Sequence, residues 1–114
     1  MREVSVGTNH TAGSKQTVFT VPPKHYAKWN LLYVMNNGAN NKTVSVWWYD
    51  ASEAAEIEVM NTVTVTTKQY LKMDGGAYVV LEEGDQIRIQ AEAGSTLASI
   101  NTFELITSRN SAIT

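Results

Sequence analysis

The sequence contains no cysteine, only two histidines and two prolines, and no long apolar run. Without cysteine, neither a disulfide framework nor a thiolate-bound metal site can form, and the redox compartment cannot be inferred. The first residues lack the seven or more consecutive apolar residues of a signal peptide, and no window approaches the roughly 20 apolar residues of a membrane span. We therefore expect no membrane association and no export signal in this chain.

Charge is also sparse. Charged residues make up 18% of the chain and the formal net charge is -2, so there is no broad electrostatic reason to bind nucleic acid. A length of 114 residues corresponds to one domain, which buries roughly two-thirds of the surface that its unfolded chain exposes. No internal repeat or linker divides it. We expect a single domain over residues 1–114, in which the polar segments 1–14 and 108–114 are terminal arms.

Clusters of reactive side chains are missing as well. His10 and His25 stand in polar sequence, with no second imidazole or carboxylate at helical or strand spacing. Both are predicted to be solvated loop histidines rather than metal ligands or acid–base groups. The acidic residues form no Asp-rich calcium loop and no recognisable pair for glycoside hydrolysis. The sequence therefore predicts no catalytic residue, no metal ligand and no cofactor, and the chain is not expected to be an enzyme.

Residues typical of turns occur at regular intervals. Segment 36–41, rich in Asn and Gly, predicts a β-hairpin between the runs that flank it. At 83–85, Gly84 is expected to supply a positive φ and Asp85 a bond from its side chain to the backbone. Gly75 and Gly76 predict a turn, because a phosphate loop would need a following helix. Segment 50–56 has helical composition but is too short for a stable helix, so a loop or single turn is expected.

Between these turns lie short runs of β-branched and aromatic residues. The run 16–21 predicts a strand that ends at two prolines, and 29–36 is apolar on both parities, which favours a central strand. The run 42–49 alternates, and 57–66 fits one strand or two. In 95–107 the apolar parity switches partway, which predicts a bulge or a change of sheet.

Further short strands are expected at 68–73, 78–81 and 86–91, giving about eight in all. With no long amphipathic helix, this pattern predicts an all-β fold, an antiparallel two-sheet β-sandwich of the jelly-roll or immunoglobulin-like type. The pattern leaves the strand order open.

The aromatic residues are the best sequence argument for binding. Trp47 and Trp48 are adjacent, so in a regular strand they point to opposite faces. By parity with Val44 and Val46, Trp48 is expected to point inward and Trp47 outward, on the same face as Tyr49. An outward aromatic that its own domain leaves uncovered marks an oligomer or partner interface, and it can also stack on a sugar ring.

Several of these motifs together resemble a known group of proteins. The likeness runs from the TVP strand end near Pro22, through the Asn-containing turn and the Val-rich run 43–46, to the L-x-x-G-D-x-I pattern of 81–87 and a closing strand at 100–105. This combination resembles the small β-sandwich domains of tailed-bacteriophage virion proteins. It departs from the group in the aromatic-rich insertion around residues 47–56.

The resemblance implies a virion structural protein at the capsid surface, most simply a capsid decoration or cement protein that binds the major capsid protein as a homotrimer. We hypothesise that the interface uses Trp47 and Tyr49, together with Arg2 and Arg109 of the terminal arms. An alternative is a tail- or fibre-associated domain that attaches to a host receptor, either glycan or protein. A third is a carbohydrate-binding module, a class normally fused to a catalytic domain.

Overall fold

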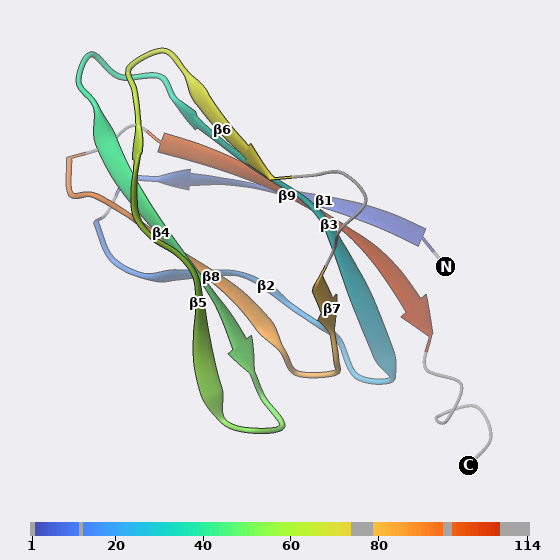
Figure 1. Cartoon of the computed structure of the whole chain (residues 1–114). Coiled ribbons are helices and arrows are strands. Elements are labelled where there is room, and N and C mark those ends of the chain that lie inside the picture. The colour runs from blue at the N-terminus through green and yellow to red at the C-terminus, as the bar shows by residue number, and fades with distance from the viewer. Residues whose placement is uncertain (1, 12, 74–78, 95–96, 108–114) are drawn as a thin grey trace.

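The computed structural model describes residues 2–11, 13–73, 79–94 and 97–107, and these residues form nine strands without a helix. Two antiparallel sheets pack face to face (Figure 1). One sheet has the order β1-β9-β3-β6, with β7 also beside β3, and the other has the order β2-β8-β4-β5. The strands are β1 (Arg2–His10), β2 (Gln16–Thr20), β3 (His25–Asn36), β4 (Lys42–Asp50), β5 (Ala55–Val65), β6 (Tyr70–Met73), β7 (Val79–Leu81), β8 (Gln86–Ala91) and β9 (Leu97–Thr107).

The strand order is that of a jelly roll. Strands β6 and β7 pair with two successive stretches of the same edge of β3, so together they fill one strand position. The nine strands thus occupy eight positions, four in each sheet. The predicted β-sandwich with about eight strands is confirmed, and the topology selects the jelly roll over the immunoglobulin-like arrangement. The predicted central position of β3 is confirmed too, since β9 lines its other edge.

The predicted hairpin at 36–41 is wrong. Strands β3 and β4 belong to different sheets, so this segment carries the chain across the sandwich. Asn36 is buried at the corner, where its Nδ2 donates to the carbonyl oxygens of Asn40 and Val65, each at 2.9 Å. Its Oδ1 accepts the backbone N–H of Gly38 at 2.9 Å. The same residue types serve hairpins and corners, so composition alone does not distinguish the two.

The core lies between the two sheets. Its largest members are Trp29 and Phe103, both almost fully buried, and the Phe103 ring stacks on Phe19 with centroids 4.0 Å apart. Aliphatic side chains from β3, β4 and β8 fill the remaining space, as expected for inward positions of alternating strands. The four-residue turn 51–54 joins β4 to β5, which is one continuous strand.

The parity slip predicted in the last strand is also wrong. Strand β9 alternates regularly, and every second residue from Leu97 to Leu105 is buried. Two of these inward positions, Ser99 and Asn101, are polar. The alternation of buried and exposed positions is therefore not visible as an alternation of apolar and polar residues in the sequence. The irregularity lies in β3, where the pairing with β9 shifts between Trp29 and Leu31. The shift turns both Trp29 and Leu32 toward the core.

The amino-terminal segment is not an arm. Strand β1 pairs along its whole length with β9, and Val4 and Val6 pack against the core. Its apolar positions alternate with Glu3, Ser5 and Gly7, so the segment is half-buried and looks polar overall. The other predicted arm, 108–114, lies outside the described residues.

Candidate interaction surface on the four-stranded sheet

Trp47 and Tyr49 lie on the outer face of β4. The inward positions of this strand are Val44, Val46 and Trp48, and Trp48 packs against the core as its parity predicts. The two outer rings are only partly buried, and no described strand lies over this face of the sheet. The expected division between Trp48 and Trp47 therefore holds.

Cations cover both outer rings. The Lys15 Nζ atom lies 4.0 Å from the centroid of the Trp47 ring, and the Arg88 Cζ atom lies 4.2 Å from that of Tyr49. Glu56 links the two cations, with its Oε1 2.7 Å from Lys15 Nζ and its Oε2 3.0 Å from Arg88 Nη1. We call these five residues the capped aromatic cluster. Cation–π contacts of this kind contribute roughly 0.5–1 kcal/mol each at exposed sites.

Strand register brings the cluster together. Arg88 of β8 stands opposite Trp47, and Glu56 of β5 stands opposite Tyr49, so all four side chains share the outer face. Lys15 joins them from the end of the connection between β1 and β2. Lys15, Glu56 and Arg88 were not predicted from the sequence, because they come from three separate segments and meet only through strand pairing.

The carboxylate at the centre of the cluster is stabilised in its charged form. The hydrogen bond from Lys15 is the main cause that lowers the pKa of Glu56 below its ordinary value, and Arg88 acts in the same direction. One carboxylate between two cations leaves the cluster with a single net positive charge. The two cations lie over the Trp47 and Tyr49 rings and are held together by the Glu56 carboxylate.

The other two predicted interface residues do not join this cluster. Arg2 is exposed on β1, opposite Leu105, in the five-stranded sheet. Arg109 lies outside the described residues. The structure therefore places Trp47 and Tyr49 on one surface and Arg2 on a different sheet.

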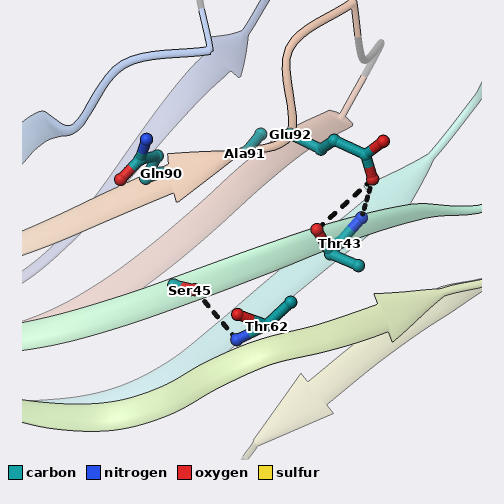
Figure 2. A pocket seen from close by; sticks show the side chains of 6 residues that line it. All are labelled: Thr43, Ser45, Thr62, Gln90, Ala91 and Glu92. Carbon is teal, nitrogen blue, oxygen red and sulfur yellow. Dashed lines mark hydrogen bonds between the residues drawn. The ribbon is translucent and has the colours of Figure 1, made fainter.

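A shallow polar hollow of about 210 Å³ opens on the same four-stranded sheet. Figure 2 shows its lining side chains on three neighbouring segments: β4, β5 and the end of β8. Ser45, which lines it, precedes Trp47 by two positions, so both side chains lie on the outer face of β4. The lining residues are Thr43, Ser45, Thr62, Gln90, Ala91 and Glu92.

The histidines differ from each other. His10 was expected to be solvated, but it is 1% exposed, and its Nδ1 and Nε2 lie 2.8 Å from Gln16 Oε1 and 2.7 Å from Ser99 Oγ. Burial lowers the pKa of His10, while the bond with Gln16 opposes that shift. The prediction for His10 failed because the sequence does not show its burial. One partner, Gln16, is polar and nearby, and the other, Ser99, is 89 positions away. His25 is half-buried at the start of β3, where its Nδ1 lies 2.9 Å from the Pro23 carbonyl oxygen.

The turn predicted at 83–85 is confirmed. Gly84 has a φ of 86°, and the buried Asp85 accepts the backbone N–H of Glu82 at 3.0 Å and that of Ala51 at 2.9 Å. The turn joins β7 to β8 across the two sheets. Gly75 and Gly76 lie outside the described residues.

The described ranges 2–11, 13–73, 79–94 and 97–107 also bear on metal binding and membrane insertion. These residues contain no group of three or more His, Cys, Asp or Glu side chains placed to hold a metal ion. Nor does any helix within them have the length and hydropathy needed to cross a bilayer.

No family model matches this chain, and no curated protein does. The chain is similar to a solved structure from Bacillus endospore appendages, described as disulfide-linked pili, with 15% identity and a TM-score of 0.54 over 94% of this chain and 86% of that one. It is similar to a chain of the T13 IBDV viral particle with 10% identity and a TM-score of 0.60. That match covers 91% of this chain and 30% of the viral chain.

A third similar structure is the globular domain of zebrafish complement 1qA protein, with 16% identity and a TM-score of 0.52 over 93% of this chain and 98% of that one. At these identities the likeness concerns the fold alone. The comparisons therefore place the chain among two-sheet β-sandwiches found in proteins of very different origin.

Proposed function

We propose that this chain is a non-catalytic structural module that joins a larger assembly through contact area and shape. The observation that carries the proposal is the capped aromatic cluster, in which Trp47 and Tyr49 form a preorganised surface on an open sheet. Aromatic rings and arginine are the residues most enriched in the centres of protein interfaces. Rings that are already fixed lose little conformational freedom when a partner binds.

The specific role that we propose is capsid decoration in a tailed bacteriophage. The resemblance of residues 17–105 to phage virion domains supports it, and similar folds in a viral particle and in a pilus are compatible with it. In this role the chain binds the major capsid protein on the outside of the lattice and stabilises it. A homotrimer suits that task, because several weak contacts made at once give high avidity.

The number of copies of this chain in each particle tests the proposed decoration role. Quantitative mass spectrometry of particles purified from the phage that encodes the chain would compare it with the major capsid protein. Hundreds of copies per particle are expected for a decoration protein. A handful of copies confined to the tail would overturn that assignment.

Rebinding of the protein to stripped particles tests whether the capped aromatic cluster makes the contact. Particles stripped of the protein would be titrated with the wild type, with Trp47→Ala and with Tyr49→Ala. If these rings are binding hot spots, each change weakens binding by roughly 30-fold or more. The matched control is Tyr70→Ala, which removes a ring that is 56% exposed on the other sheet. Loss of binding in the control alone would show that the opposite face makes the contact.

A second candidate is a tail- or fibre-associated domain that attaches to a host receptor. The polar hollow on the outer face of the same sheet favours this alternative, because protein interfaces centred on aromatic rings need no such hollow. The copy-number measurement separates the two roles.

A further inference from the structure

A bulge in β5 borders the polar hollow, because Thr62 is one of its lining residues. Val44 and Val46 of β4 pair with Val63 and Met60, so two residues of β5 stand opposite the single residue Ser45. One of these two is Thr62, whose φ of 53° is in the left-handed region. That conformation is rare and strained for a β-branched residue. Bulges and strained residues of this kind are concentrated at functional sites.

Internal hydrogen bonds hold the walls in place. The Thr62 backbone N–H donates to Ser45 Oγ at 2.9 Å, and the N–H of Thr43 donates to Glu92 Oε1 at 3.1 Å (Figure 2). On the third side, Gln90 Nε2 donates to the Gly13 carbonyl oxygen at 3.1 Å. Each bond uses only part of the capacity of the side chain involved. The hollow is therefore preorganised before any ligand arrives.

The remaining capacity is complementary to hydroxyl groups. Ser45 Oγ already accepts a bond, so its own O–H is left to donate, and Gln90 keeps its Oε1 as an acceptor. The second carboxylate oxygen of Glu92 lies 3.7 Å from Lys42 Nζ and has further lone pairs. Ligand hydroxyls both donate and accept, so two or more hydroxyls on one ligand can satisfy all three groups. A ligand anion would instead be placed beside the Glu92 carboxylate.

The volume of the hollow and its position near Trp47 limit the class of ligand further. The volume of the hollow is about 210 Å³, whereas pockets for drug-sized ligands have roughly 300–1,000 Å³. The hollow therefore suits a ligand of one sugar-sized ring rather than a larger molecule. Trp47 lies two positions beyond Ser45 on the same face, roughly 7 Å along the strand, and its ring carries the Lys15 cation. We propose that the hollow binds one neutral sugar unit of a glycan, with Ser45, Gln90 and Glu92 as its hydroxyl partners. This goes beyond the assembly role and does not depend on it.

Titration of the isolated chain tests the proposal. Methyl glycosides of glucose, galactose, mannose and N-acetylglucosamine would be added separately and followed by NMR chemical shifts of the backbone amides. At least one is expected to bind with a dissociation constant on the order of 1 mM and to shift residues that line the hollow. N-acetylneuraminic acid, which is anionic, is expected to bind more weakly than the best neutral sugar.

Two variants assign the contacts. Glu92→Gln keeps an oxygen for Thr43 but removes the charge, and Gln90→Ala removes the amide; each is expected to weaken binding about tenfold. Thr17→Ala, on the same outer face but outside the hollow, is the matched control and should bind as the wild type does. Amide spectra of each variant establish that it is folded.

Binding that survives both changes, or shifts confined to residues away from the hollow, would overturn the proposal. So would the absence of any shift with all four neutral sugars at tens of millimolar, or a preference for the anionic sugar. The titration needs no viral particle, so its failure leaves the copy-number and rebinding tests of the assembly role unaffected.

Discussion

The indole N–H of Trp48 donates to Asp85 Oδ2 at 3.1 Å, which ties the end of β4 to the turn before β8. The same carboxylate accepts backbone N–H groups from Ala51 and Glu82. The buried carboxylate of Asp85 therefore connects the β4–β5 turn with the turn between β7 and β8. A buried carboxylate is tolerated in this position because three donors surround it.

Replacing Asp85 by Ala should destabilise the fold strongly. The change leaves three donors without their acceptor in a place that water reaches poorly, and we expect a loss of about 3–5 kcal/mol in the free energy of unfolding. Urea denaturation measures it. Glu53→Ala, on the exposed surface of the neighbouring turn, is the control and should change stability by less than about 0.5 kcal/mol. A similar small effect for Asp85→Ala would contradict the role assigned to the carboxylate.

Stability should fall as the pH drops below about 6.5, because burial lowers the pKa of His10 in the folded chain. Between the folded and unfolded pKa values, the unfolded state binds more protons, so acidification favours it by up to about 1.4 kcal/mol per pH unit. Urea denaturation at pH 7.5, 6.5 and 5.5 measures this loss.

His10→Gln should be less stable at neutral pH, since it disrupts the bonds with Gln16 and Ser99, but its stability should depend less on pH in this range. His25→Gln is the matched control, as His25 lies beside the Pro23 carbonyl and outside that buried network. An unchanged pH dependence in His10→Gln would show that another group is responsible.

Apolar alternation was enough to predict the sandwich and the inward side of β4, because hydrophobic burial sets the period of a strand. It failed where polar residues are buried. Ser99 and Asn101 point inward and bond with His10 and Trp29, which are about 90 and 70 positions away in the sequence, so no local pattern shows that these polar residues are buried.

The interaction surface was predictable only in part. Local parity placed Trp47 and Tyr49 outward, but their cover by Lys15 and Arg88 depends on which strands are neighbours. The polar hollow was not predictable, because the bulge at Thr62 is visible only in the pairing of β4 with β5. Strand order is a property of the whole chain, and turn residues do not reveal it.

The two glycines Gly84 and Gly7 should respond oppositely to alanine. Gly84 has a φ of 86°, and an added Cβ would lie 3.3 Å from the Ala51 Cβ, so Gly84→Ala should cost about 1–2 kcal/mol. Gly7 stands in β1 with no atom within 4 Å of an added Cβ, so Gly7→Ala should be neutral or stabilising by up to about 1 kcal/mol. Thermal unfolding of both variants measures the difference, and equal effects would contradict the assigned backbone role of Gly84.

The ion pairs of the capped aromatic cluster should fix the positions of its side chains but contribute little to the free energy of unfolding. Exposed ion pairs contribute less than about 1 kcal/mol, so Glu56→Gln should lower the free energy of unfolding only slightly, and less still in 1 M salt. Its effect on structure should be larger, because the carboxylate holds Lys15 over the Trp47 ring. The ring current of Trp47 should displace the Lys15 Hε resonances upfield in the wild type, and this displacement should shrink in Glu56→Gln. Glu58→Gln, on the same strand and opposite Trp47, should leave it unchanged, and an equal loss in both variants would show that Glu56 has no special part in seating Lys15.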